Sequence, residues 1–220
     1  MIAESSSGSQ KNKEIKKTEQ SIRQMASILH GYSANCPNLH GLLHGDYKVD
    51  NLVFHPTEPK VLAVLDWELS TMGDGYCDVA NLCMMYFMPS IEKGWGVAGL
   101  GDMDVEGTGI LTRNHVVETY CNYSQQHNNA MKHSLISPTP SLAIRPANFK
   151  EAKAWAGFYL SFLFMKNCVI VHGVSQRASS GVASSELAHR VANLLPEMVK
   201  LTWKILEDYP PPRVDVSSKL

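Results

Sequence analysis

Side chains with oxygen and amine groups gather in one short stretch of the sequence, His44-Gly45-Asp46-Tyr47-Lys48-Val49-Asp50-Asn51. A further acid, Asp66, follows the next apolar run. Carboxylate and amide oxygens are the ligands that hard cations such as Mg²⁺ prefer. Residues 44–78 hold seven acids against two bases, which gives this stretch a charge of −5 in a chain whose net charge is −1. Such a local excess of negative charge favours a bound cation.

The stretch has the spacing of the protein-kinase catalytic loop, H-R-D-L-x-x-x-N, in which an Asp precedes an Asn by five positions. Phosphoryl transfer needs a group that accepts the proton of the attacking hydroxyl, and cations that neutralise the phosphates. Asp46 is the predicted proton acceptor, and Asn51 and Asp66 are the predicted ligands of one or two Mg²⁺ ions. Lys48 is predicted to offset the charge of the γ-phosphate. Three further residues are candidates for a supporting role: His44, Glu68 and Asp78.

Two short apolar runs position these residues. Residues 52–55 and 61–65 are β-prone and are joined by Pro56-Thr57-Glu58-Pro59, which predicts a β-hairpin with a turn of more than two residues. Because a hairpin brings the ends of its strands together, we expect Asn51 and Asp66 to meet over one metal ion. Helices are predicted at residues 14–30, 79–87, 112–128 (with Thr112 as N-cap), 151–173 and 184–207, and a long loop at 94–109. The predicted fold class is α+β, mostly helical.

Three motifs carry a resemblance to a known family. HGDYKVDN, then VLDWE, then GDGYCDVA is similar to the aminoglycoside phosphotransferase and choline-kinase-like family, whose motifs read H-G-D-x-x-x-x-N, D-W and G-D-P-x-x-D-L-A. Within that family the chain looks like the kinase-like domain fused ahead of an acyl-CoA dehydrogenase domain in certain fatty-acid-degrading proteins. The likeness spans roughly residues 39–205 and includes NLVFHPTEPKVLAVLDWELSTMGD, GTGILTRNHVVETYC and FYLSFLFMKNCVIVHGVSQRASSG.

This resemblance implies the C-terminal lobe of a protein-kinase-like fold, with ATP as phosphate donor, Mg²⁺, and the hydroxyl of a small molecule as acceptor. Those relatives phosphorylate 4-hydroxyacyl-CoA, so the implied acceptor is a hydroxyacyl-CoA of fatty-acid catabolism and an implied partner is a separate acyl-CoA dehydrogenase. The resemblance also implies that Asp78 ties down the catalytic loop. Two positions depart from the family. Gly75 replaces a usual proline, which predicts a looser turn, and Met165-Lys166 replaces an expected Phe-Arg pair.

The sequence ahead of His44 lacks the features with which a kinase-like fold holds its nucleotide. A complete fold has an N-terminal lobe of about 90 residues, with a glycine-rich strand-turn-strand and a lysine paired to a helix glutamate. The 43 residues before His44 show neither, and the chain contains no G-x-x-x-x-G-K-[ST] motif. The alternative of a catalytically inactive pseudokinase or scaffold therefore stays open, as does that of a fragment or a truncated gene product.

Composition excludes several classes of protein. The chain is 44% hydrophobic and 19% charged, as is typical of a globular domain, and its net charge predicts no general affinity for nucleic acid. The five cysteines form no C-x-x-C pair, which favours a reducing compartment. The longest apolar run, residues 157–174, contains Lys166, Asn167 and His172, so we predict a buried helix and no membrane span.

Three segments are predicted along the chain. Residues 1–13 are expected to be a disordered leader, residues 14–207 the kinase-like lobe with an exposed insertion at 133–150, and residues 208–220 an extended tail. The tail ends in Ser218-Lys219-Leu220, the tripeptide that the peroxisomal import receptor reads. The predicted location is therefore the peroxisomal matrix, with that receptor as a partner, and a cytoplasmic or mitochondrial location is the alternative.

Overall fold

The computed structural model describes residues 2–33, 41–90, 99–132, 149–179 and 193–210. The helices are α1 (Ile2–Ser33), α2 (Tyr76–Cys83), α3 (Arg113–Lys132), α4 (Phe149–Ser179) and α6 (Leu195–Asp208). The strands are β1 (Gly41–Leu43), β2 (Leu52–Phe54), β3 (Val61–Val64) and β4 (Thr71–Gly73), and short 3₁₀ turns are η1 (Val49–Asn51), η2 (Trp67–Leu69) and η3 (Met84–Tyr86). The described part of the chain is thus mostly helical with two small antiparallel sheets, which confirms the fold class at this level.

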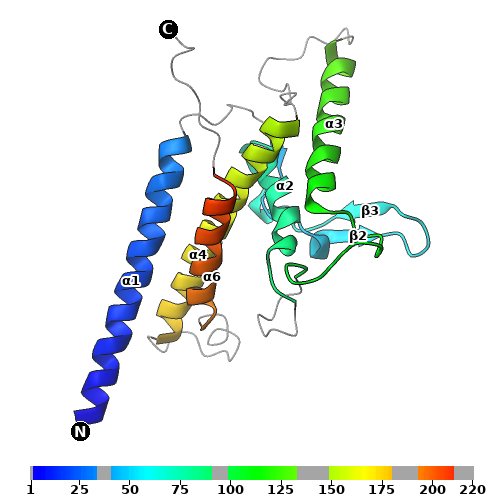
Figure 1. The fold of residues 1–220 in the computed structure, drawn as a ribbon. Coiled ribbons are helices and arrows are strands. Elements are labelled where there is room, and N and C mark those ends of the chain that lie inside the picture. Colours follow the sequence, from blue (N-terminus) through cyan, green and yellow to red (C-terminus); the bar gives the residue numbers. More distant parts are fainter. Residues whose placement is uncertain (1, 34–40, 91–98, 133–148, 180–192, 211–220) are drawn as a thin grey trace, which may run out of the picture. The chain divides into compact units, whose positions relative to one another are not determined.

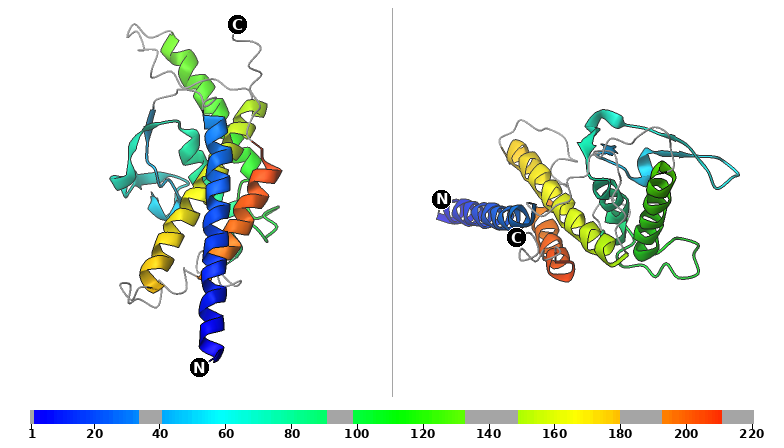
Figure 2. Two further views of the ribbon diagram at one scale, coloured as in Figure 1. Left: turned by 90° about the vertical axis from the view of Figure 1, so that its left-hand side faces the viewer. Right: turned by 90° about the horizontal axis from the view of Figure 1, so that it is seen from above.

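The chain divides into two compact units. The first contains residues 1–34 and 161–213 and is built from α1, the C-terminal part of α4, and α6. In both Figure 1 and Figure 2, α1 and α6 run side by side. Its core is mainly apolar and includes the buried side chains of Met25, Leu29, Phe164, Cys168 and Ile205, together with the buried hydroxyls of Ser161 and Thr202.

Polar contacts join the three helices of this first unit. The indole Nε1 of Trp203 donates a hydrogen bond to Ser21 Oγ at 2.6 Å, which links α6 to α1. His172 Nε2 lies 3.1 Å from Glu19 Oε1, which links α4 to α1. The amphipathic pattern of α6, with Met198, Val199 and Ile205 buried, places its apolar face in this core.

The second unit contains residues 35–160 and 214–220, and within its described residues it holds both sheets, α2, α3 and the N-terminal part of α4. Strand β1 pairs with β4, with Leu42 opposite Met72, and β2 pairs with β3, with Leu52 opposite Val64. Figure 1 shows the β2–β3 hairpin extending outward from this unit. Its helices enclose a core of buried apolar side chains: Tyr76, Val79, Val117, Trp155, Phe158 and Leu160.

The structure agrees with most of the predicted elements. The hairpin, the loop after residue 99, and helices at α2, α3, α4 and α6 are confirmed within the described residues. Thr112 caps α3, since its Oγ1 accepts a hydrogen bond from the His115 amide at 3.4 Å. Strands β1 and β4 were not predicted, because three residues are too few for a periodic pattern.

The N-terminal prediction differs from the structure. Residues 2–13, predicted to be a disordered leader, belong to α1, which begins at Ile2. A helix already formed over residues 14–33 extends by one hydrogen bond for each residue added, so extension is much easier than nucleation. Of the predicted insertion at 133–150, residues 133–148 lie outside the described residues, and 149–150 are the first two residues of α4. Of the predicted tail at 208–220, Asp208 ends α6 and the residues beyond 210 lie outside the described residues.

Helix α4 is both long and apolar. Its segment Ala152–Ala178 is long and apolar enough to span a membrane by length and composition, and 56% of its most apolar window is buried within the structure. The core helix of a folded domain has the same properties, and Phe164 and Cys168 of this helix are completely buried. Phe162, Val169 and Ile170 of the same helix are exposed, so the predicted buried helix is confirmed in part.

Candidate active site

The predicted catalytic loop follows β1 and begins at a buried histidine, His44. The next residue, Gly45, has a φ of +82°, a conformation that residues with a Cβ rarely adopt. A Cβ added there would lie 2.4 Å from the backbone oxygen of Leu69. The glycine of the H-G-D motif is therefore required both by its backbone conformation and by the close approach of the η2 segment.

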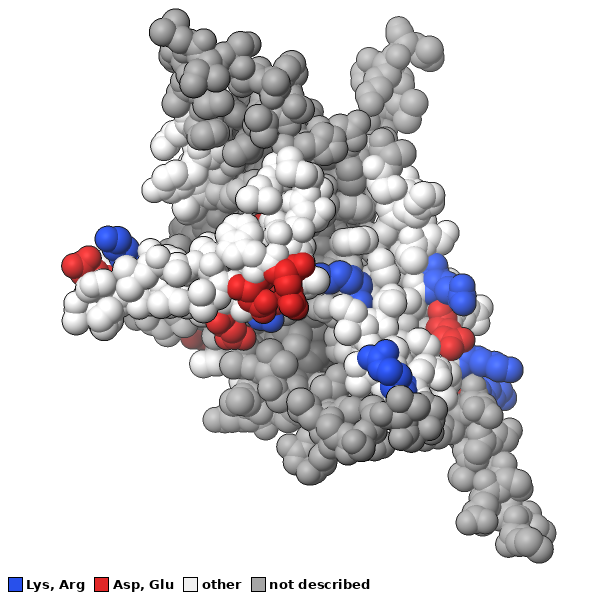
Figure 3. Space-filling view, turned by 180° about the vertical axis from the view of Figure 1, so that it is seen from behind, with Lys and Arg blue, Asp and Glu red and all other residues white. Residues whose placement is uncertain are grey.

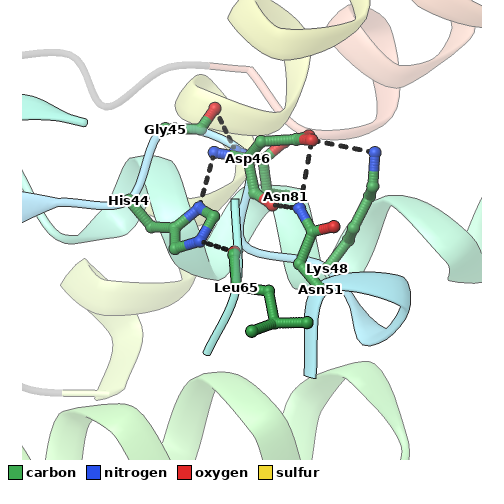
Figure 4. A network of polar contacts seen from close by, with 7 residues as sticks. All are labelled: His44, Gly45, Asp46, Lys48, Asn51, Leu65 and Asn81. Carbon is green, nitrogen blue, oxygen red and sulfur yellow. Dashed lines mark hydrogen bonds and ion pairs between the residues drawn. The ribbon is translucent and has the colours of Figure 1, made fainter. Parts of the chain in front are cut away.

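Asp46, Lys48 and Asn51 meet at the end of this loop, as Figure 4 shows. The Asn51 side-chain amide donates hydrogen bonds to the Asp46 backbone oxygen at 2.8 Å and to Asp46 Oδ2 at 3.2 Å. Lys48 Nζ forms an ion pair with the same Oδ2 at 2.8 Å. Asn51 is buried, whereas the carboxylate of Asp46 is partly exposed, so a fixed amide orients an acid that a substrate can reach.

His44 joins this loop to the segment that leads to Asp66. Its Nδ1 accepts a hydrogen bond from the Asp46 amide at 3.2 Å, and its Nε2 lies 2.7 Å from the Leu65 backbone oxygen. Since a carbonyl oxygen only accepts, Nε2 carries the proton and the ring is the neutral Nε2–H tautomer. The Trp67 ring packs against the imidazole with the ring centroids 4.7 Å apart.

The backbone just before Asp66 is hydrogen-bonded to the backbone of Asn51. The Leu65 amide donates to the Asn51 backbone oxygen at 2.8 Å, so the hairpin does bring the two predicted ligands to one end of its strands. Asp66 itself has a φ of +66°, the left-handed conformation that Asp and Asn tolerate better than most residues. Asp66 and Glu68 are exposed, and within the described part of the chain neither carboxylate forms a hydrogen bond or an ion pair.

Helix α2 holds the loop from the other side. The two carboxylate oxygens of Asp78 accept hydrogen bonds from the backbone amides of His44 at 2.8 Å and of Gly45 at 2.9 Å. The buried Asn81 donates to the Gly45 backbone oxygen at 3.2 Å. Sequence reasoning missed Asn81, although its position three residues after Asp78 puts both side chains on one face of a helix.

The predicted ligands Asn51 and Asp66 carry oxygen atoms of the kind that Mg²⁺ prefers, and their roles stay predictions. The described residues hold no group of three or more His, Cys, Asp or Glu side chains that could bind a metal ion. Mg²⁺ does not need such a cage, because it is usually bound by one or two carboxylates together with substrate phosphates and water. The Asn51 nitrogen is used in the bonds to Asp46, and Figure 4 shows the amide oxygen turned away from that acid. This oxygen is the atom that could bind the ion.

The charged surface shows no extended patch of one sign on the face drawn in Figure 3. Acidic and basic side chains form a few separated groups there, and one of these groups is acidic. The exposed acids of the site region include Asp50, Asp66 and Glu68. Carboxylates of this kind can bind a small cation.

Comparison with known proteins agrees with this geometry. The sequence pattern of the phosphotransferase enzyme family matches residues 12–102, a range that includes the whole catalytic loop and α2. The chain carries a phosphotransferase-family domain. The family resemblance inferred from the motifs is thus confirmed.

The similarity to known proteins extends well beyond residues 12–102. Acyl-CoA dehydrogenase family member 10 of Mus musculus is 36% identical over 74% of this chain but only 13% of its own length. Acyl-CoA dehydrogenase family member 11 of Rattus norvegicus is 32% identical over 91% of this chain and 23% of its own length. The chain thus spans less than a quarter of these relatives.

A solved structure matches the fold. A Ralstonia eutropha protein assigned as an aminoglycoside phosphotransferase superimposes with a TM-score of 0.62 at 26% sequence identity. The match covers 90% of this chain and 55% of the R. eutropha chain. The small antiparallel sheets and surrounding helices therefore belong to the architecture of this family.

One departure from the family pattern is compensated in three dimensions. Gly75 stands where a proline was expected, and a looser turn was predicted there. A Cβ at Gly75 would lie 2.1 Å from the Tyr120 hydroxyl, so the α3 tyrosine occupies the space beside this glycine. Burial raises the pKa of Tyr120 to about 12, with further contributions from the nearby Asp74 and Asp78. The turn is therefore packed, not open.

Proposed function

We propose that this domain transfers the γ-phosphate of ATP to the hydroxyl of a small molecule in a Mg²⁺-dependent reaction. The observation that carries the proposal is the contact of Asp46 with Asn51 and Lys48 inside an H-G-D-x-x-x-x-N loop. This arrangement joins a partly exposed acid, a fixed amide and a cation within one loop. Phosphoryl transfer uses these three kinds of group.

Each residue has a separate role in the proposed reaction. Asp46 accepts the proton of the attacking hydroxyl, and its position is fixed by Asn51. Asn51 and Asp66 would hold the metal ion, and bound Mg²⁺ would supply positive charge to the phosphates of ATP. Lys48 adds a further positive charge close to the reacting groups. His44 and Asp78 hold the backbone of the loop.

We further propose that the domain is the C-terminal lobe of a protein-kinase-like fold, with the β2–β3 hairpin carrying the metal ligands at its base. The R. eutropha match supports this, since it covers most of this chain and about half of the other. The acceptor we propose is a hydroxyacyl-CoA. Two relatives are named as acyl-CoA dehydrogenase family members, which is consistent with a substrate of fatty-acid catabolism and with an acyl-CoA dehydrogenase partner.

Binding of MgATP to the 220-residue chain tests the nucleotide part of the proposal. Isothermal titration calorimetry should detect MgATP binding by the natural chain, and Asp66→Asn should weaken it because a metal ligand is lost. The control is Asp104→Asn, because Asp104 is an exposed acid in the loop before α3. Equal affinity in the Asp66→Asn and natural chains would contradict the role of Asp66.

Transfer to an acceptor is tested with a 4-hydroxyacyl-CoA and radiolabelled ATP. Asp46→Asn should remove product formation while leaving MgATP binding in place, because Asp46 acts on the acceptor hydroxyl. Removing a general base lowers turnover by about 10²- to 10⁴-fold. Product formation at the natural rate in Asp46→Asn would end the assignment of Asp46.

A scaffold without catalytic activity is the second candidate. The R. eutropha match covers 55% of that chain, and the MgATP experiment decides between the two candidates. Micromolar MgATP binding in the calorimetric experiment would contradict the scaffold function.

We propose the peroxisomal matrix as the location of a chain that ends in Ser218-Lys219-Leu220, with the import receptor as its partner. A fusion with a fluorescent protein at the N-terminus should co-localise with peroxisomes, and deletion of Leu220 should disperse it. Diffuse fluorescence of both fusions would indicate the cytoplasm, and mitochondrial fluorescence of both would indicate the mitochondrion.

A further inference from the structure

A buried acid, Asp74, lies just before the start of α2, four positions ahead of Asp78. Asp74 is 7% exposed. Its Oδ1 accepts a hydrogen bond from the Tyr76 amide at 2.9 Å, and its Oδ2 accepts one from the Tyr159 hydroxyl at 3.0 Å. The first bond holds the amino end of α2 and the second ties that end to α4.

The aromatic side chains around Asp74 enclose this contact. Tyr76 and Tyr159 are both buried, and their rings stack with an interplanar angle of 14°. The Tyr76 ring also meets Tyr120 of α3 edge-on, with the centroids 5.2 Å apart. A buried carboxylate with two donors in a rigid aromatic surrounding is strongly held, because its hydrogen bonds have no water to replace them.

Helix α2 transmits the position of this anchor to the catalytic loop. Asp78 follows Asp74 by four positions, and its carboxylate accepts hydrogen bonds from the amides of His44 and Gly45. Asn81, on the next turn, donates to the Gly45 carbonyl. A short helix moves as a rigid body, so a displacement of its amino end displaces both contacts with the loop.

We propose that the Tyr159–Asp74 hydrogen bond positions the catalytic loop through α2, and that Tyr159 is a positioning residue for phosphoryl transfer. The catalytic part of this inference rests on the proposed function. Neither Tyr159 nor Asp74 is expected to touch a substrate, since both are buried. Tyr159 fixes the position of the Asp78 carboxylate relative to the backbone amides of His44 and Gly45.

The deciding experiment measures hydrogen exchange of single amides by NMR in the 220-residue chain. Tyr159→Phe removes one hydroxyl and keeps the ring. The reference is the amide of Val117, a buried residue of α3. Relative to it, we expect the His44 and Gly45 amides to exchange about tenfold faster, because the loss of one hydrogen bond to a charged group changes an equilibrium constant by about tenfold. Asp74→Asn is the second variant, since it keeps Oδ1 for the Tyr76 amide and replaces the acceptor for Tyr159 with an NH₂ group. The Tyr159 hydroxyl can then only accept a hydrogen bond there, and this neutral bond is weaker than one to a carboxylate. This variant should shift the ratio in the same direction.

Two controls separate positioning from general stability. Tyr123→Phe removes the hydroxyl of an exposed α3 tyrosine and should leave the ratio unchanged. Thr202→Val removes a buried hydroxyl that donates to the Met198 carbonyl in the other unit, so any change should affect all amides of the catalytic unit alike. If Tyr159→Phe and Asp74→Asn speed up the amides of His44, Gly45 and Val117 equally, or change none of them, the inference is overturned.

Kinetics provide a readout of the catalytic part. In Tyr159→Phe, kcat for the acceptor should fall several-fold while its KM stays unchanged, because the position of Asp46 changes and the exposed surface does not. If the exchange ratio rises in Tyr159→Phe but the natural chain transfers no phosphate, the positioning of the loop by Tyr159 is supported and the proposed function is rejected. An unchanged ratio in a chain that does transfer phosphate would reject the anchor alone.

Discussion

At the scale of single residues, Gly45 combines a left-handed backbone with a close contact to Leu69. Gly45→Ala should therefore lower the free energy of unfolding by about 3 kcal/mol, of which about 1 kcal/mol comes from the positive φ and the rest from the clash. Chemical denaturation with urea measures this change.

Gly107 is the matched control for that substitution. It also has a positive φ, +73°, but a Cβ there would meet nothing within 4 Å. Both alanines restrict the unfolded chain equally, so the difference between Gly45→Ala and Gly107→Ala isolates the clash. Equal losses in the two variants would show that Leu69 moves away freely.

Asp74 should make the stability of the chain depend on pH. Burial raises the pKa of its carboxyl above 3.8, against the opposing effects of the bonds from Tyr76 and Tyr159. The folded chain therefore holds this proton to a higher pH than the unfolded chain does, and the free energy of unfolding should fall as pH rises from about 4 through the folded-state pKa. Urea denaturation at a series of pH values measures the free energy of unfolding of the natural chain and of Asp74→Asn. The difference between these two free energies, followed against pH, reports the contribution of Asp74.

Asp104 provides the comparison for the pH series. The Oδ1 of Asp104 accepts a hydrogen bond from the amide two residues later, and the Oδ1 of Asp74 does the same. The contact of Asp104 is exposed, whereas that of Asp74 is buried. Asp104→Asn is the exposed substitution measured alongside Asp74→Asn. A flat difference for Asp74→Asn across the series would contradict the effect of burial.

At the scale of elements, the contact between the start of α2 and α3 depends on a fit between Gly75 and Tyr120. Gly75→Ala should destabilise the chain by about 2 kcal/mol, because the new methyl group meets the tyrosine hydroxyl. In a Tyr120→Phe background the nearest ring carbon lies 3.2 Å from the Cβ position, so the loss should shrink by about 1 kcal/mol or more. A double-mutant cycle by urea denaturation measures this coupling.

The control for this cycle is Gly31→Ala in α1. A Cβ at Gly31 meets nothing within 4 Å, and alanine is favoured over glycine in a helix by about 1 kcal/mol. Its effect should be neutral or stabilising, and the same with or without Tyr120→Phe. Absence of coupling between positions 75 and 120 would mean that the turn relaxes around the new methyl group.

At the scale of the whole molecule, α4 passes without interruption through both compact units. Trp155 and Phe158 lie in the core of one unit, and Phe164 and Cys168 in the core of the other. Because breaking the helix between residues 160 and 161 would release several backbone hydrogen bonds and expose both cores, we predict that the units unfold together. The indole N–H signals of Trp155 and Trp203 in an NMR urea titration should disappear at one midpoint, and two separate midpoints would show independent units.

Much of the fold could be predicted because its signals are local. The hairpin is given by two β-prone runs around Pro56-Thr57-Glu58-Pro59, and the long helices by their apolar periodicity. Strands β1 and β4 could not be predicted, since each is three residues long and forms only by pairing with the other across 30 residues of chain. The extension of α1 to Ile2 was missed because a polar segment carries no periodicity.

The sequence by itself determined the contacts that short spacing enforces. Asp46 and Asn51 are five residues apart in one tight loop, so their hydrogen bond follows from the local backbone. The family resemblance implied that Asp78 ties down the catalytic loop, but only the tertiary structure decided that it accepts the amide of His44, 34 residues away. Only the tertiary structure decided, too, that Tyr159 reaches Asp74 across 85 residues. Such contacts depend on how helices pack against one another, and packing depends on the combined shapes of many side chains, which no single stretch of sequence specifies.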